Sequence, residues 1–239
     1  NLRWSDATPL TAADLVFTIN TIKDLETHSP LSPTWQGITA EEITDREARL
    51  TLQSPYAFFF ETLRALKIIP RHIFNSIPPA NLRLSRYNLE PVGNGPYMFE
   101  SMRTEKDGFI TAIALVPNPH YHQTPPFITA FTARLYRTER SMIDDFNKRA
   151  IDGLGGLNPE YSAELTIAHR LIALSLPRYY AIFFNPTAHL ALKEKEVRRA
   201  LTDAIDRKKI ISAVFGGYAT AITGPLPPSV FNHASNNGG

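Results

Sequence analysis

The sequence contains no cysteine, which excludes disulfide bonds, thiolate metal sites and cysteine nucleophiles. This absence is compatible with an oxidising compartment but does not establish one. No apolar run approaches the length of a membrane span, and the chain opens with Asn1-Leu2-Arg3, without a signal-peptide pattern or an initiator methionine. The formal charge of +2 is too small to indicate nucleic acid or an anionic membrane as a partner.

Sequence patterns typical of enzymes are also missing. There is neither a Gly-x-Ser-x-Gly elbow nor a His-Glu-x-x-His motif, so the signs of a hydrolase are absent. The segment Gly153-Leu154-Gly155-Gly156 lacks the Gly-Lys-Ser/Thr that a phosphate-binding loop requires. Asp144 and Asp145 are adjacent, so on a helix they diverge by about 100° and do not form a catalytic carboxylate pair. We therefore predict no catalytic residue and no cofactor.

Two polar clusters have simpler interpretations than ligand binding. His120 and His122 alternate along an extended stretch and could share a metal, yet no third ligand is visible nearby and the flanking prolines indicate a surface turn. A basic cluster lies on the polar faces of two expected helices without interleaved aromatics, which favours solvation over contact with nucleic acid. Its members are Arg198, Arg199, Arg207, Lys208 and Lys209. The sequence therefore predicts neither a metal site nor nucleic-acid binding.

What the sequence does contain is the composition of an ordinary globular protein, with 239 residues and 43% hydrophobic side chains. That length accommodates one large or two modest domains. The most informative segment is Glu196–Ile210, where an apolar stripe at helical spacing predicts a short amphipathic helix. Asp206 is placed to cap a second helix, which Gly216-Gly217 ends.

Other elements follow from spacing and from turn residues. Thr11 and Asp14 form a capping-box pattern that begins a helix, and His28–Pro33 is expected to be a loop because of its two prolines. A hairpin is expected over 38–43 and 48–53, a short helix over 56–66, and a turn at Gly93–Pro96. Further strands are expected at 97–102, 110–116, 130–136, 171–176 and 180–184, with short helices at 139–148 and 159–168. Strands mixed with helices predict the α/β class.

Five segments in the same order resemble the extracytoplasmic solute-binding proteins of peptide-type ABC importers, the family that includes oligopeptide, dipeptide and nickel-chelate receptors. The first is Trp4-Ser5-Asp6-Ala7-Thr8-Pro9-Leu10-Thr11, similar to the family's "WSDG-x-P-L-T" pattern. The others are Val92–Tyr97 ("VGTGPY"), Pro117–Tyr121 ("R-N-P-x-Y"), Ala181–Asn185 (a strand ending in "FN") and the helix pair after Glu196. Together they span about residues 3 to 228.

Three positions depart from the family pattern. Ala7 stands where the family has Gly, and Arg149-Ala150-Ile151-Asp152 stands where it has "GEID". Both lie in expected turns. His122 replaces the usual Trp after the Tyr, which removes an aromatic surface. We expect that neighbourhood to pack differently in this chain.

The resemblance implies an incomplete periplasmic-binding-protein-like type II (cluster C) fold with two lobes. Residues 1–92 would form part of the smaller lobe and 93–225 part of the larger lobe, while 226–239 would start a crossing to a further lobe. It also implies an extracytoplasmic protein, monomeric in the family, that captures peptides or similar solutes between its lobes and delivers them to a membrane permease. The chain then corresponds to an internal fragment, which we expect to bind peptide weakly and to self-associate through exposed apolar faces.

The resemblance also suggests ligand-binding residues. It places Asn185 at the wall of the cleft, where a carboxamide can bracket a peptide backbone, with Phe183 in the same strand. Trp35, in the expected loop after the first helix, is a candidate aromatic platform. Tyr97 is a candidate contact beside the inter-lobe crossing. Hinge residues are expected at that crossing and at the proline-rich passage near the end of the chain: Gly93, Gly95 and Pro225.

Two alternatives stay open within this framework. The seven histidines and the absence of cysteine suggest a nickel or metal-chelate receptor of the same transporter class. A second possibility is a signalling receptor that uses the same lobes to sense peptide without meeting a permease. An enzyme has the least support of the classes considered.

Overall fold

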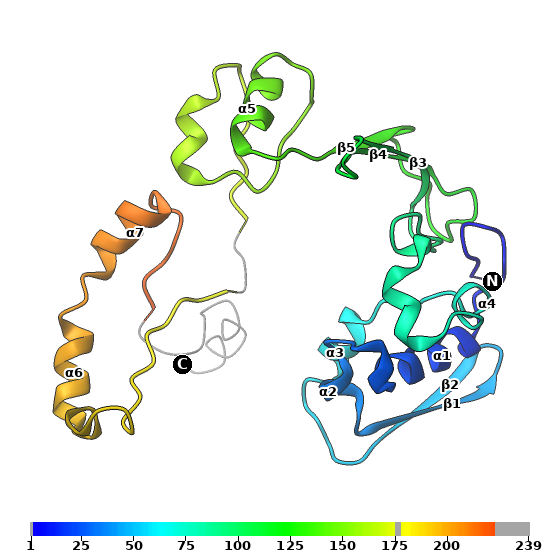
Figure 1. The fold of residues 1–239 in the computed structure, drawn as a ribbon, viewed down its shortest axis with the longest axis horizontal. Coiled ribbons are helices and arrows are strands. Elements are labelled where there is room, and N and C mark those ends of the chain that lie inside the picture. The colour runs from blue at the N-terminus through cyan, green and yellow to red at the C-terminus, as the bar shows by residue number, and fades with distance from the viewer. Residues whose placement is uncertain (1, 175–177, 223–239) are drawn as a thin grey trace, which may run out of the picture. The chain divides into compact units, whose positions relative to one another are not determined.

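The computed structural model describes residues 2–174 and 178–222, so Pro225 and the segment 226–239 lie outside the described residues. The chain divides into two compact units, Asn1–Leu135 and a second that begins at Tyr136 (Figure 1). This division falls at a different position from the expected lobe boundary at residue 93, and the lobe assignment stays a prediction. Each unit is described separately below.

The first unit begins with a helix packed on a hairpin. Helix α1 (Ala12–Lys23) starts where the carboxylate of Asp14 accepts a hydrogen bond from the Thr11 N–H at 2.9 Å, as the capping-box pattern predicts. The hairpin consists of β1 (Ile38–Thr44) and β2 (Glu47–Leu52), paired antiparallel. The expected position of the hairpin is confirmed. The alternating apolar residues of both strands lie on one face, which packs against α1.

The core of this unit is formed by α1, the hairpin and a short helix that was not predicted from the sequence. Ile19 and Ile22 of α1 pack with Trp35 and Ile38. Trp35 belongs to α2 (Ser32–Trp35), so the expected loop at 28–33 is wrong in its last two residues. Pro33 is tolerated in the first turn of α2 because that position has no intrahelical N–H to donate.

The rest of the helix-rich part of this unit is made of short elements: α3 (Phe59–Ala65), α4 (Arg71–Phe74) and the 3₁₀ turns η1 (Leu25–Thr27), η2 (Pro79–Leu84) and η3 (Arg86–Asn88). Beyond it lies an antiparallel sheet with the order β3-β4-β5. Its strands are β3 (Tyr97–Thr104), β4 (Ile110–Pro117) and β5 (Phe131–Arg134). These three expected strands are confirmed.

The second unit is mainly helical. Its α-helices are α5 (Glu139–Asn147), α6 (Lys195–Asp203) and α7 (Arg207–Phe215), and its 3₁₀ turns are η4 (Pro159–Glu164) and η5 (Leu190–Lys193). The predicted cap of α7 is confirmed: Asp206 accepts the Lys209 N–H at 2.9 Å, and Gly216 ends the helix in the left-handed conformation. The expected helix at 159–168 is shorter and of the 3₁₀ type.

Two expected strands are wrong where the structure describes them. Neither 171–174 nor 180–184 forms a strand, although both are rich in apolar residues. A strand is stable only when a neighbour pairs with its backbone N–H and C=O groups, and no described segment pairs with these residues. Residues 180–184 accordingly have no regular secondary structure, and Ile182 and Phe183 are exposed.

Two of the positions that depart from the family pattern adopt the left-handed conformation. Ala7 has φ 71° and Arg149 has φ 59°, and the family has glycine at both. A left-handed backbone brings the Cβ atom close to the following carbonyl oxygen, which glycine avoids. The glycines of the family pattern are thus explained by backbone conformation, and this chain tolerates the strain.

We expect Ala7→Gly to raise the free energy of unfolding by roughly 0.5–1 kcal/mol, because it relieves the strain at Ala7 while loosening the unfolded chain only modestly. Ala13→Gly, in the first turn of the right-handed helix α1, is the matched control and should lower the stability. Urea denaturation of the three proteins measures both changes. Destabilisation by Ala7→Gly would contradict the explanation.

Candidate functional site

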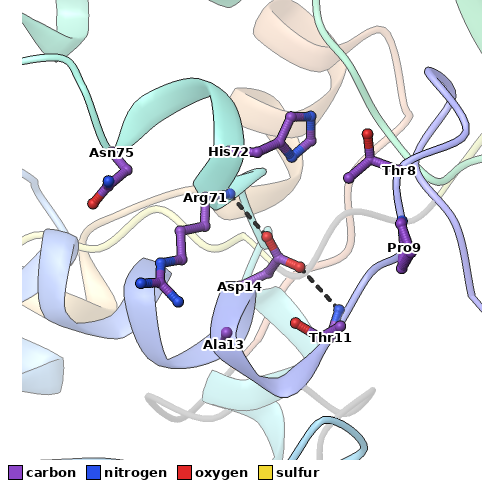
Figure 2. Close-up of a pocket in the computed structure, with 8 residues that line it drawn as sticks. All are labelled: Thr8, Pro9, Thr11, Ala13, Asp14, Arg71, His72 and Asn75. Atoms are coloured by element: carbon purple, nitrogen blue, oxygen red, sulfur yellow. Dashed lines mark hydrogen bonds between the residues drawn. The ribbon is translucent and has the colours of Figure 1, made fainter.

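A buried carboxylate joins three separate segments of the first unit. Asp14 is 4% exposed, and its Oδ1 accepts a hydrogen bond from the Arg71 N–H at 2.8 Å. Its Oδ2 accepts from the Thr11 N–H at 2.9 Å and, at 3.4 Å, from the indole N–H of Trp4. Figure 2 shows the two backbone hydrogen bonds. Because its acceptor positions face these donors, Asp14 is a structural group rather than a free base.

A second buried polar residue extends this network. The hydroxyl of Thr18 donates to the carbonyl of Asp14 at 2.7 Å and accepts from the Ile69 N–H at 3.0 Å. Asp14 and Thr18, one turn apart on α1, therefore hold residues 69–71, which lead into α4. The "WSD-x-x-P-L-T" similarity thus corresponds largely to a packing and capping motif, in which Trp4 is 1% exposed.

An open depression lies over this network. Its volume is about 250 Å³, and its lining residues come from the N-terminal loop, from α1 and from α4 (Figure 2). They are Thr8, Pro9, Thr11, Ala13, Asp14, Arg71, His72 and Asn75. A larger polar hollow of about 790 Å³ is lined by residues of 23–36, including Lys23, His28 and Gln36.

The rim of the depression carries an ion pair between segments far apart in sequence. The Nε2 atom of His72 lies 2.7 Å from Oδ2 of Asp6, and Oδ1 of Asp6 accepts the Thr8 N–H at 3.0 Å. Burial raises the pKa of Asp6, but the hydrogen bonds with His72 and Thr8 lower it by more, so the pKa lies below its ordinary value of 3.8. The pair fastens the N-terminal loop to α4.

The predicted ligand residues of the first unit make internal contacts. Trp35 is 1% exposed and packs in the core of this unit, and its contact with a ligand stays a prediction. Tyr97 begins β3, and its hydroxyl donates to the carbonyl of Ile128 at 3.0 Å. Its ring centroid lies 6.2 Å from that of Phe131. Tyr97 therefore supports the approach to β5, and its contact with a ligand stays a prediction.

The predicted ligand residues of the second unit are exposed. Phe183 is 84% exposed, and Asn185 ends the extended segment. The Oδ1 atom of Asn185 accepts hydrogen bonds from the Thr187 N–H at 3.0 Å and from the Thr187 hydroxyl at 2.7 Å. Asn185 thus caps the following turn with its oxygen, while its NH₂ group has no partner among the described residues.

The predicted hinge glycines lie in a turn held by hydrogen bonds. The carbonyl of Gly93 accepts the Ser5 N–H at 2.8 Å, and that of Gly95 accepts from Nδ2 of Asn118 at 2.9 Å. Neither glycine is left-handed. The hinge role of both stays a prediction, as does that of Pro225, which lies outside the described residues.

The part of the chain that the structure describes contains no group of three or more His, Cys, Asp or Glu side chains arranged to hold a metal. His122 contacts its neighbours instead: its Nε2 atom lies 3.2 Å from Nε2 of Gln123, and its ring packs against Tyr121. Within the described ranges, no helix combines the length and apolar character needed to cross a bilayer.

Several of these residues were not identified from the sequence. Asp14 was expected to cap α1, but its bonds to Trp4 and Arg71 span 10 and 57 residues. Asn118 and His72 likewise act on segments that are distant in sequence. The sequence shows these residues as polar side chains next to apolar ones. It does not show which distant groups they bond to.

The chain is similar to bacterial solute-binding proteins. A family model described as bacterial extracellular solute-binding proteins, family 5 middle, matches residues 1–239. Protein XP55 of Streptomyces lividans is 28% identical over 95% of this chain and 40% of its own length. Oligopeptide-binding protein AppA of Bacillus subtilis is 24% identical over 97% of this chain and 42% of its length. The chain therefore spans less than half the length of these relatives.

Solved structures of solute-binding proteins also resemble this chain. The substrate-binding protein CtaP of Listeria monocytogenes matches 95% of this chain and 46% of its own chain with a TM-score of 0.79 and 28% identity. The B. subtilis AppA structure, in complex with a nonapeptide, matches with a TM-score of 0.74 and 23% identity over 95% of this chain and 45% of its own. The predicted fold class, an incomplete two-lobed type II periplasmic-binding-protein fold, is confirmed.

The Asp6–His72 pair makes the stability of the first unit depend on pH. Because the folded pKa of Asp6 is below 3.8, its contribution is fully present above that pH and is lost as the pH falls through the folded value. Asp6→Asn should therefore lower the melting temperature at neutral pH, and the difference from wild type should shrink at low pH.

The matched control is Asp24→Asn, since Asp24 also accepts the N–H of the residue two positions ahead, Glu26, at 2.9 Å. Melting temperatures of the three proteins between pH 2 and pH 7 provide the measurement. The same pH-dependent difference in both variants would contradict a role specific to the His72 pair.

Proposed function

This chain belongs to family 5 of the bacterial extracellular solute-binding proteins, and from that premise we propose that it is part of the substrate-binding component of an ABC importer. The match of the family model to residues 1–239 is the observation that carries the proposal. The complete protein would capture peptides or similar solutes in a cleft between two lobes and deliver them to a membrane permease. It would act outside the cytoplasm, and it would bind its ligand without breaking a bond.

Similar proteins of the same family support peptide as the ligand class. AppA is described as oligopeptide-binding, and its structure holds a nonapeptide. CtaP is described as an ABC transporter substrate-binding protein. A peptide backbone offers alternating donors and acceptors along an extended line, which side-chain amides and strand edges recognise independently of sequence.

The segment that ends at Asn185 has suitable chemistry for such a ligand. Phe183 and Asn185 are two residues apart in a segment without assigned secondary structure, and both are exposed. If the segment extends along a ligand, the two side chains would project to the same side. An exposed ring beside a free NH₂ group provides apolar contact and a hydrogen-bond donor to a ligand carbonyl. The turn cap from Oδ1 to Thr187 fixes the orientation of the amide before the ligand arrives.

Binding would be coupled to closure of the lobes. A ligand shifts an equilibrium between open and closed forms only by its difference in affinity for the two. Contacts to both lobes provide that difference, because they form together only in the closed state. The permease would then recognise the closed form.

The proposal is tested with the complete gene product that carries these residues. The protein is mixed with a defined library of di- to decapeptides, separated from unbound peptide by gel filtration, and denatured for mass spectrometry. We expect peptides of varied sequence to co-purify and calorimetry to give micromolar or tighter dissociation constants. Retention of a nickel chelate without any peptide would instead support the metal-chelate alternative, and retention of neither would contradict import of both solute classes.

Asn185→Asp tests the amide directly, because an aspartate keeps the acceptor that caps the turn and loses the NH₂ donor. We expect the peptide dissociation constant to rise about tenfold, which corresponds to one hydrogen bond of about 1.4 kcal/mol. The control is Thr187→Ala, which removes the hydroxyl bond to Oδ1 and leaves the NH₂ group intact. Unchanged affinity in Asn185→Asp, or equal losses in both variants, would remove Asn185 from the binding site.

A further inference from the structure

The chain passes from its helix-hairpin part (residues 12–88) into the β3-β4-β5 sheet through the turn Gly93–Pro96. Three carbonyls of this turn accept hydrogen bonds from outside it. Gly93 accepts from the Ser5 N–H at 2.8 Å, and Pro96 accepts from the Asn118 N–H at 2.9 Å. Gly95 accepts from Nδ2 of Asn118, also at 2.9 Å. One residue thus provides two of the three bonds that hold the turn.

Asn118 is well placed for this function. It follows the last residue of β4, Pro117, and is 2% exposed. Its Oδ1 atom accepts the His120 N–H at 2.9 Å, so both ends of the amide are used. A buried side chain with all these bonds made has one orientation, because any other would leave polar groups unsatisfied. Asn118 therefore fastens the turn to the end of β4 in a defined geometry.

The two glycines of the turn are not required by the conformation observed. Neither has a positive φ, and a Cβ atom built on Gly93 or Gly95 meets no atom within 4 Å. What glycine adds at these positions is backbone freedom rather than space. The turn is therefore restrained by its hydrogen bonds and not by its own sterics.

Few contacts between regular elements join the sheet to the helix-hairpin part. The helices and strands between Ala12 and Asn88 make at most sparse contacts with β3, β4 and β5. The backbone conformation of the Gly93–Pro96 turn consequently has a large effect on how the sheet is oriented relative to the helix-hairpin part. A short turn between two parts that share few other contacts has the features of a hinge.

We infer that Asn118 is a positioning residue that holds the Gly93–Pro96 turn and thereby sets the orientation of the helix-hairpin part relative to the sheet. The functional meaning of this inference rests on the proposed function, because orientation at a hinge determines how readily the lobes close. Asn118 acts through the turn and does not touch the ligand. Loss of its amide frees the turn without altering the glycines.

The test measures orientation without ligand. The 239 residues contain no cysteine, so spin labels are attached at Glu42→Cys in β1 and Thr132→Cys in β5, both exposed positions. Distances between the labels are measured by double electron–electron resonance in the complete gene product. We expect a narrow distribution in the otherwise unchanged protein and a broader one in Asn118→Asp, where a carboxylate faces the carbonyl of Gly95.

Asn147 is the matched control, because its amide makes the same two kinds of bond in the second unit. Its Nδ2 donates to the carbonyl of Glu164 at 2.8 Å, and its Oδ1 accepts the Thr166 N–H at 2.8 Å. Both Asn→Asp variants should lower the melting temperature by about 2–6 °C. Only Asn118→Asp should broaden the distribution. A distribution as narrow as in the parent protein, or equal broadening in both variants, would reduce Asn118 to a structural cap and overturn the inference.

A second variant covers the case in which Asn118→Asp does not fold. Gly95→Ala fits the open space at this position and restricts the turn without removing a hydrogen bond. Combined with Asn118→Ala, it should restore part of the narrow distribution, and failure to do so would count against the inference. Addition of peptide forms a separate arm: no peptide response in the parent protein would contradict the proposed function, while the ligand-free comparison still decides the role of Asn118.

Discussion

The first unit depends on one buried carboxylate. Asp14 is removed from solvent at the start of α1, and that position is stable only because N–H groups converge on it from the N-terminal loop, from the helix start and from the entrance to α4. Without the carboxylate, those donors would lose their acceptor at the base of the depression. The tryptophan and threonine of this motif therefore act as partners of a structural carboxylate.

The same principle appears at each irregular junction of this unit. The buried polar side chains of its described residues are Asp14, Thr18, Ser32 and Asn118, and each one bonds to backbone or side-chain groups where a regular element begins, ends or turns. The apolar core around Ile19 and Trp35 provides cohesion, while these polar groups determine the paths of the connecting segments. Asn118 is the member of this set that acts on the turn leading into the β3-β4-β5 sheet.

The second unit shows the limit of local prediction. Helix α6 follows from the spacing of its apolar residues. Helix α7 follows from its caps, because Asp206 and Gly216 act within one turn of their own positions. The apolar stretch ending at Phe184 has strong strand propensity, yet it forms no strand and is unpaired among the described residues. Strand formation requires a second segment at hydrogen-bonding distance, and propensity does not supply one. The role of Asn185 likewise depends on which group comes within hydrogen-bonding distance of its NH₂ group.

The sequence by itself determined the family, the α/β class and those elements whose signals are local, such as the caps of α1 and α7 and the hairpin at β1 and β2. These depend on interactions between residues a few positions apart, which a linear sequence displays directly. Tertiary structure decided that Trp35 is a core residue, that Asp14 bonds to Arg71, and that Asn118 holds Gly95. Each of those outcomes depends on burial or on a hydrogen bond between distant segments, whose free energy exists only once the chain has brought them together.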